Sequence, residues 1–266
     1  MITHKLNKLI KSLFYYFNIN ISATTEKHKL LTFLSSVRPV TTEYELIRIG
    51  GDADGGYLIP NDIEHIESCF SPGVNNIADF EDALTKRGIK CYLADYSVVG
   101  PPFKNRLFDF EAKYIGSKND DIFITLEDWI NRKKQCSGDS ILQMDIEGDE
   151  FAVIYATSPE VLRKFRIIVI EFHQLNYLFD KFGFKLISLT FEKLLKDFEI
   201  VHVHPNNCLK PIRSRGFIIP PVMEFTFLRK DRIVNKSYTQ SFPHRLDRKN
   251  IPNKNDFPLP DCWFRY

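Results

Sequence analysis

Residues 140–154, SILQMDIEGDEFAVI, constrain the fold more than any other stretch of the sequence. Residues 141–144 carry no charge and are typical of a fully buried strand, and a helix-like pattern begins after Gly148. Asp145 lies between the two, at the expected carboxyl end of the strand. In an open parallel sheet, ligands bind outside the carboxyl ends of the strands. The stretch therefore predicts an α/β protein in which Asp145 and Glu147 lie close to a ligand.

A second apolar run, residues 166–172 (RIIVIEF), repeats this arrangement, because Glu171 lies near its end and His173 follows it. Two neighbouring buried strands would then bring acidic side chains to the same edge of the sheet. A single Asp after a strand is more often the N-cap of the next helix. Acids at both strand ends favour a functional site, with Asp145, Glu147, Glu171 and His173 as catalytic candidates.

Residues 66–94 show the order strand, loop, helix, strand, which is typical of a nucleotide-binding βαβ unit. Gly73 in the loop SPGVNN lets a ligand approach the backbone closely. Asp95, after the second strand, occupies the position from which an acid binds the two hydroxyls of an adenosine ribose. The loop lacks the GxGxxG spacing of a pyrophosphate site, and no P-loop follows. We therefore expect an adenosine ligand without phosphates rather than NAD or ATP.

A stretch rich in Gly and Asp, residues 48–62 (RIGGDADGGYLIPND), precedes this unit. Its glycines suit a tight hairpin between two strands. The density of Asp beside Gly also leaves room for a loop that contacts the ligand. The candidate cofactor-binding residues are Asp54, Gly55, Gly73, Val74, Asn75, Asp95 and Ser97.

The rest of the chain continues the alternation of strands and helices. We expect further strands at residues 109–115, 198–204 and 222–228, and further helices at residues 126–134 and 188–196. This predicts a doubly wound α/β layout with seven strands and five intervening helices. The expected organisation is an N-terminal helical appendage (1–40), one α/β domain (41–234) and a wrapping tail (235–266).

Composition excludes several classes of protein. The net charge of +2, with basic and acidic residues interleaved, does not indicate a nucleic-acid partner. The five cysteines lack paired CxxC spacing, so we expect neither a disulfide framework nor a zinc cluster. No apolar run of about 18 residues and no signal-peptide pattern are present, and we expect a cytoplasmic protein. A basic amphipathic helix over residues 4–17 fits contact with its own domain, a partner protein or the inner face of the membrane.

Seven segments in order resemble the FkbM-type S-adenosylmethionine-dependent methyltransferases, in particular the branch encoded with bacterial surface-glycan genes. They are RIGGDADGGY, CFSPGVNNIADFE, ITLEDWI, LQMDIEGDE, VIEFH, VHVHPNN and MEFTFLRKD. The resemblance covers residue 43 to about residue 230. SPGVNN contains fewer glycines than the usual family loop.

This resemblance implies a class I methyltransferase fold, which is Rossmann-like: a seven-stranded, mostly parallel sheet with one antiparallel strand and helices on both faces. It also implies S-adenosylmethionine as the cofactor and O-methylation of a sugar or glycan hydroxyl in surface polysaccharide biosynthesis. By the same resemblance, Gly73 and its neighbours face the methionine part of the cofactor and Asp95 faces its ribose. Asp145 and Glu147 lie between cofactor and acceptor.

Methyl transfer to a hydroxyl requires an aligned acceptor oxygen and removal of one proton. His173 is the expected base, because imidazole titrates near neutrality. His204 is another candidate, and we expect only one of His202 and His204 to face the site. A divalent metal held by Asp145 and Glu171, acting as a Lewis acid, is the other mechanism.

Two alternative functions remain open on the sequence alone. One is a non-catalytic domain that binds an adenosine ligand, and the other is a methyltransferase for a small-molecule hydroxyl. A nucleotide-sugar enzyme on a similar sheet would need phosphate-binding loops that the sequence lacks.

Overall fold

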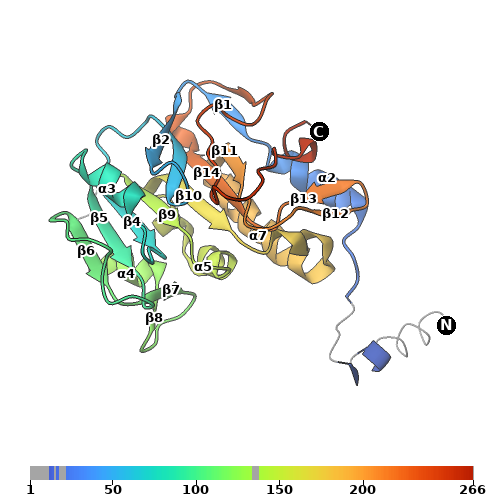
Figure 1. The fold of residues 1–266 in the computed structure, drawn as a ribbon, viewed down its shortest axis with the longest axis horizontal. Coiled ribbons are helices and arrows are strands. Elements are labelled where there is room, and N and C mark those ends of the chain that lie inside the picture. The colour runs from blue at the N-terminus through green and yellow to red at the C-terminus, as the bar shows by residue number, and fades with distance from the viewer. Residues whose placement is uncertain (1–11, 15, 18–21, 134–137, 266) are drawn as a thin grey trace.

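The computed structural model describes residues 12–14, 16–17, 22–133 and 138–265 (Figure 1). The amphipathic helix expected over residues 4–17 lies mostly outside these residues, as does Cys136. Within the described part of the chain, no helix is long and apolar enough to cross a membrane.

Among the described residues, seven strands form the central sheet, in the order β6-β5-β4-β9-β10-β14-β11. Strand β14 runs antiparallel to both β10 and β11, and the other neighbouring pairs are parallel. This strand order with one antiparallel strand is that of the class I methyltransferase fold, so the predicted fold class is confirmed. The strands are β4 (Ser68–Pro72), β5 (Lys90–Ala94), β6 (Phe108–Glu111), β9 (Ser140–Met144), β10 (Phe165–Phe172), β11 (Phe198–Pro205) and β14 (Met223–Arg229).

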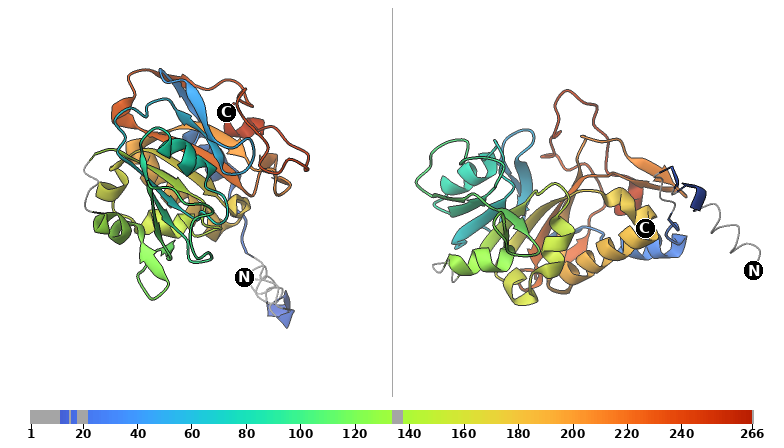
Figure 2. Two further views of the ribbon diagram at one scale, coloured as in Figure 1. Left: turned by 60° about the vertical axis from the view of Figure 1, so that its left-hand side comes forward. Right: turned by 90° about the horizontal axis from the view of Figure 1, so that it is seen from below.

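The sheet separates two hydrophobic layers. Figure 2 gives two further views of the sheet and of the helices packed on it. Alternate residues of a strand point to opposite faces, and Phe70 packs in one layer while its neighbour Cys69 packs in the other. The first face carries α2 (Lys27–Ser36), α4 (Leu126–Arg132), α5 (Glu150–Ala156), α6 (Pro159–Leu162) and α7 (Lys181–Asp197). The second carries α3 (Asp79–Thr85) and the hairpin of β2 (Leu46–Gly50) and β3 (Gly56–Pro60).

Helices α4 and α7 begin at residues whose side chains act as N-caps. Thr125 caps α4 by accepting a hydrogen bond from the Asp128 backbone N–H, as the sequence predicts. Asp180 caps α7 by accepting from the Phe182 and Gly183 backbone N–H groups. Helix α7 therefore begins well before the expected residue 188, and a short 3₁₀ helix, Leu175–Phe179, precedes it.

The prediction of one continuous strand at residues 109–115 is wrong. This segment forms two strands, β6 and β7 (Tyr114–Gly116). Strand β7 pairs in parallel with β8 (Phe123–Thr125), a strand that the sequence-based prediction missed. The Lys113 backbone N–H donates to the Glu111 carbonyl oxygen at 2.8 Å, and this tight turn ends β6. The first strand of the βαβ unit, expected at residues 66–70, is shifted to Ser68–Pro72.

The last part of the chain packs over the body. Strand β15 (Lys236–Tyr238) pairs with β1 (Val40–Thr42) near the start of the described chain. Trp263, in the 3₁₀ helix Asp261–Trp263, is fully buried, and its indole N–H donates to the Ile218 carbonyl oxygen at 3.2 Å. The remaining elements are the hairpin of β12 (Ile212–Ser214) and β13 (Phe217–Ile219) and a 3₁₀ helix, Lys230–Arg232.

The cysteines in the described part of the chain are all free thiols, as expected. Cys69 and Cys91 are paired across β4 and β5 and are fully buried as small apolar residues.

Candidate active site

A cavity of about 500 Å³ lies at the carboxyl ends of β4, β5 and β9. Strands β5 and β6, which follow β4 in the sequence, lie on one side of β4 in the sheet. The next strand of the sheet, β9, lies on the other side of β4. Ligands of doubly wound proteins bind at such a switch in strand order. The volume lies within the usual range for small-molecule sites. All seven expected cofactor-binding residues line this cavity: Asp54, Gly55, Gly73, Val74, Asn75, Asp95 and Ser97.

The loop after β4 is held tightly against the end of β9. Gly73 has φ +86°, and a Cβ atom there would lie 1.6 Å from the Asp145 carbonyl oxygen. A side chain is therefore excluded by the neighbouring backbone, which is a different reason from the ligand contact that the sequence suggested. The Gly73 backbone N–H also donates to the Ala94 carbonyl oxygen at 3.0 Å. These contacts place Val74 and Asn75 at the wall of the cavity.

Asp95 connects the loops that follow β4 and β5. Its Oδ2 accepts from the Asn75 backbone N–H at 2.8 Å. Its Oδ1 accepts from the Ser97 backbone N–H at 2.8 Å and from the Ser97 hydroxyl at 2.7 Å. An ionised carboxylate offers about four lone-pair positions, so the same group can accept further hydrogen bonds from a ligand.

The hairpin turn before β3 closes another side of the cavity. The Arg48 guanidinium holds the turn by donating to the carbonyl oxygens of Gly51, at 2.7 Å, and Ala53, at 2.9 Å. The Asp54 backbone N–H donates to the Asn250 carbonyl oxygen at 3.3 Å. The C-terminal part of the chain thereby contacts the turn that carries Asp54 and Gly55.

Aromatic side chains from β7 and β8 form a wall that the sequence-based prediction missed. Tyr114, Ile115 and Phe123 line the cavity, and the rings of Tyr114 and Phe123 have centroids 5.5 Å apart. Such a wall suits a flat ring of a ligand. The available signal was the pair of aromatic residues on either side of the polar loop at residues 116–121.

A row of buried polar groups also lines the cavity and was missed. The Ser71 hydroxyl contacts both Glu81 Oε1 and, at 2.6 Å, Gln143 Oε1, and Gln143 Nε2 donates to the Tyr57 hydroxyl at 3.2 Å. Burial raises the pKa of Glu81 to about 7. When its carboxyl group is protonated, Glu81 can donate a hydrogen bond to the Ser71 hydroxyl oxygen. The Ser71 hydroxyl can then donate its own proton to Gln143 Oε1. Gln143, an amide inside an apolar strand, was the only sequence signal for this row.

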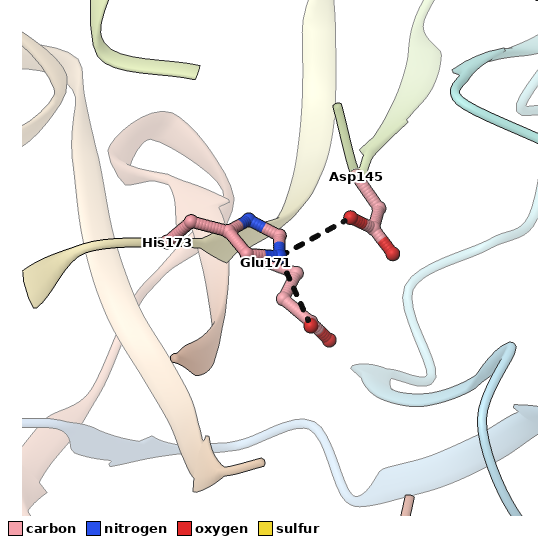
Figure 3. Close-up of side chains that lie close together, drawn as sticks. All are labelled: Asp145, Glu171 and His173. Carbon is pink, nitrogen blue, oxygen red and sulfur yellow. Dashed lines mark ion pairs between the residues drawn. The ribbon is translucent and has the colours of Figure 1, made fainter. Parts of the chain in front are cut away.

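Asp145, Glu171 and His173 converge as the two strand ends predicted (Figure 3). His173 Nε2 lies 3.9 Å from Asp145 Oδ1, 3.7 Å from Glu171 Oε1 and 3.5 Å from Glu147 Oε2. Asp145 lines the cavity of about 500 Å³, as does Glu147, whose side chain is largely exposed. Asp145 does not cap a helix, because the N-cap of α5 is Asp149.

Glu150, the first residue of α5, was not predicted to belong to the site. Its side chain is fully buried, and Oε1 accepts from the backbone N–H groups of Ile146, at 3.2 Å, and Gly148, at 3.0 Å. The same oxygen lies 3.1 Å from His173 Nδ1. This contact assigns the neutral imidazole proton to Nδ1 and leaves the Nε2 lone pair facing Asp145 and Glu171. In the sequence, Glu150 resembles any acid in the first turn of a helix.

The electrostatics of this cluster favour binding of a positive charge. Burial raises the pKa of Asp145 to about 7, and the charges of Glu147 and Glu150 add to this, while His173 opposes it. Burial also raises the pKa of Glu171 well above its usual value, with a further contribution from Asp145. For His173, burial lowers the pKa, but the hydrogen bond to Glu150 and the nearby carboxylates outweigh it and the pKa is raised.

His204 does not line the cavity of about 500 Å³. It borders a separate cavity of about 220 Å³ together with Asp247. His202 Nε2 lies 2.9 Å from Asp247 Oδ1, and His204 Nδ1 lies 3.7 Å from Asp247 Oδ2. Residues two apart on a strand share a face, so both histidines meet the same carboxylate. The expectation that one of them faces the catalytic site is wrong, because neither histidine lines the cavity that carries Asp145.

Comparisons with known proteins add no argument to this geometry. No family model matches the sequence, and a search of curated proteins finds no match. One similar solved structure is described as a "putative RNA methyltransferase" from Pyrococcus horikoshii, with 9% sequence identity and a TM-score of 0.32. The match covers 77% of this chain and 99% of that one. Likeness at this level carries no argument about activity.

Proposed function

We propose that this protein is an S-adenosylmethionine-dependent O-methyltransferase. The observation that carries the proposal is the cavity at the switch in strand order of a class I methyltransferase fold, with the Asp95 carboxylate in its wall. The absence of a GxGxxG or P-loop sequence favours a nucleoside ligand without phosphates.

In this proposal each part of the cofactor contacts a different set of the residues that line the cavity. The ribose hydroxyls donate to Asp95, and the adenine ring lies against Tyr114, Ile115 and Phe123. The methionine part lies along the loop that begins at Gly73. The reactive methyl group then faces the side of the cavity that carries Asp145.

We propose a sugar or glycan hydroxyl as the acceptor, in surface polysaccharide biosynthesis. Methyl transfer is an in-line displacement, in which the acceptor oxygen bonds to the methyl carbon while the bond from carbon to sulfur breaks and S-adenosylhomocysteine leaves. The acceptor proton must also leave. The carboxylates of Asp145, Glu147 and Glu171 with His173 provide several hydrogen-bond acceptors for a molecule with many hydroxyls. The resemblance to the surface-glycan branch supports the same class of acceptor.

The remaining expectations also belong to this proposal. A cytoplasmic protein would meet both cofactor and sugar precursors, and no nucleic-acid partner is proposed. Residues 4–17 would contact a partner protein or the inner face of the membrane. Among the described apolar residues of that segment, Leu13 and Phe17 are 60% and 63% exposed, and Phe14 is half-buried.

Calorimetry with S-adenosylmethionine tests the cofactor assignment. We expect Asp95→Ala to weaken binding about tenfold or more, because a hydrogen bond to a charged group contributes roughly 1.5–3 kcal/mol. Asp95→Asn keeps the size of the side chain and removes its charge. Comparing it with Asp95→Ala therefore separates the loss of charge from a rearrangement of the loops that Asp95 connects. Asp121→Ala, at an exposed aspartate, is the control and should bind normally. Unchanged affinity in a folded Asp95→Ala protein would show that Asp95 does not hold the ribose.

Transfer of a labelled methyl group to a panel of mono- and oligosaccharides tests the activity. Turnover on a sugar acceptor supports the proposal. Saturable cofactor binding without turnover on any acceptor would favour a non-catalytic adenosine-binding domain. Turnover restricted to small non-sugar hydroxyl compounds would favour the small-molecule methyltransferase instead.

A further inference from the structure

We infer that Asp145, Glu171 and His173 together form a binding site for a divalent metal ion, with Mn²⁺ as the best-matched probe. One ligand atom from each of the three lies within 4.8 Å of the other two. Two ligands about 2.1 Å from one ion lie roughly 3–4 Å apart, and the measured separations from His173 Nε2 are 3.7 and 3.9 Å. Little movement is needed to close the site.

Each of the two carboxylates of this cluster has a buried oxygen without a hydrogen-bond partner in the described part of the chain. Asp145 Oδ1 and Glu171 Oε2 are both buried, and neither has a hydrogen-bond partner among the described residues. The Glu171 side chain is only 5% exposed. Figure 3 shows that both carboxylates and the imidazole extend from neighbouring strand ends toward one point. A buried carboxylate oxygen without a donor is costly, and a bound cation removes that cost.

Outer hydrogen bonds hold two of the three ligands in place. Glu150 Oε1 lies 3.1 Å from His173 Nδ1, and this contact aims Nε2 at the carboxylates. The Asn206 side-chain amide donates to Glu171 Oε1 at 2.9 Å. A carboxylate behind a coordinating histidine is the usual support of such a ligand. Glu150 is therefore a positioning residue for His173, in addition to holding the turn before α5 through two backbone N–H groups.

The choice of ion follows from the ligands. Carboxylate oxygens suit Mg²⁺ and Mn²⁺, whereas imidazole suits later transition metals, and Mn²⁺ accepts both. Glu147, whose side chain is 87% exposed and lies 3.5 Å from His173 Nε2, can rotate in as a further ligand. A divalent ion at this position supplies Lewis-acid polarisation of a coordinated hydroxyl. That consequence rests on the proposed methyl transfer, whereas binding of the ion does not.

Metal binding to the full chain, stripped with a chelator and measured without cofactor, tests the site. Calorimetry and the electron paramagnetic resonance signal of free Mn²⁺ should show one ion bound per chain. Glu171→Gln, Asp145→Asn and His173→Ala should each weaken binding at least tenfold. Glu150→Gln should weaken it about 10- to 100-fold while leaving the ligands in place. His65→Ala removes an exposed histidine beside Glu64 and should leave binding unchanged.

The result that overturns the site is Mn²⁺ binding of equal strength in folded Glu171→Gln and Asp145→Asn proteins, or no stoichiometric binding of Mn²⁺, Mg²⁺ or Zn²⁺ by the parent. These two substitutions preserve side-chain shape, so circular dichroism can verify the fold in each. Failure of S-adenosylmethionine to bind while Mn²⁺ still binds would reject the proposed function and retain the metal site. The reverse pattern would reject the metal site alone.

Discussion

Glu81 and Glu150 are buried glutamates near the starts of two helices, and their surroundings differ in the number of donors. Glu150 Oε1 accepts from two backbone N–H groups and meets His173 Nδ1. Glu81 meets only the Ser71 hydroxyl among the described side chains. A single neutral hydroxyl compensates poorly for the loss of water around a negative charge, so burial raises the pKa of Glu81 to about 7.

This difference predicts how stability depends on pH. An unfolded glutamate has a pKa near 4.3, so between about pH 4.3 and pH 7 folded Glu81 keeps a proton that the unfolded chain has lost. Through Glu81 alone, the free energy of unfolding should therefore fall by roughly 3–4 kcal/mol as pH rises through this window and level off above it. Glu81→Gln removes this contribution alone, because Asp145 and Glu171, whose pKa values are also raised, are unchanged in it. The variant should therefore lose less stability than the parent between pH 5 and pH 8 and be the more stable protein at pH 8.

Denaturant titrations at pH 5 and pH 8 measure the effect. Glu160→Gln, at a glutamate whose side chain is 73% exposed, is the matched control and should follow the parent at both values. A Glu81→Gln protein whose stability difference from the parent is the same at pH 5 and pH 8 would show that Glu81 is ionised in the folded state.

Single residues of the site differ in how well the sequence identifies them. Asp145, Asp95 and Glu171 could be predicted because a parallel sheet brings the carboxyl ends of its strands to one edge. Gln143 and Tyr57 could not, because their partners lie far away in the sequence and meet only after packing. Residues on strand ends are thus fixed by topology, whereas buried hydrogen-bond partners depend on the tertiary structure.

At the scale of elements, ion pairs join residues at or beside the ends of four strands. Asp62, after β3, accepts from the Arg166 guanidinium of β10 at 3.3 Å and from Arg232, after β14, at 2.8 Å. The side chains of Asp62 and Arg166 are 6% and 7% exposed. Arg166 also donates to Asp139, next to β9, at 2.8 Å. The hairpin on one face is thereby attached to the central sheet by charges as well as by apolar contacts.

We expect Asp62→Ala to lower the free energy of unfolding by about 2 kcal/mol, because buried Arg166 loses one of its two carboxylate partners while Asp139 still compensates part of its charge. Asp231→Ala should cost less than about 1 kcal/mol, since the Asp231 side chain is 61% exposed where it pairs with Arg229. Chemical denaturation of both variants measures the difference. Equal losses would mean that Asp62 acts only as a surface charge.

The elements themselves were predictable where one pattern ran without interruption. The apolar runs of β9, β10 and β14 are buried along nearly their whole length, and each was expected within one or two residues. The division into β6 and β7 depends on a turn at Lys113, and no Gly or Pro marks it in the sequence. Local turns made by ordinary residues were therefore the main source of error in the fold.

At the scale of the whole molecule, the two ends of the described chain differ in how they join the body. At the N-terminal side, the Lys181 backbone N–H donates to the Ala23 carbonyl oxygen, and the Thr25 backbone N–H donates to the Phe179 carbonyl oxygen, both at 2.9 Å. At the C-terminal side, Trp263 packs among core residues, with its ring centroid 6.0 Å from that of Phe225. The hydrogen bonds at the N-terminal side involve no residue before residue 22, whereas Trp263 at the C-terminal side is part of the hydrophobic core.

A pair of deletions should show this asymmetry. Removal of residues 1–20 should leave the melting temperature and cofactor affinity unchanged, because the contacts of Ala23 and Thr25 remain. Removal of residues 257–266 should lower the melting temperature by roughly 10 °C or more, because loss of a buried tryptophan alone costs about 3–5 kcal/mol. Trp263→Ala, which keeps the backbone, should reproduce most of that loss. An insoluble protein lacking residues 1–20 would show that the apolar stripe of residues 4–17 packs on the body, and an unaltered Trp263→Ala protein would show that the tail does not complete the core.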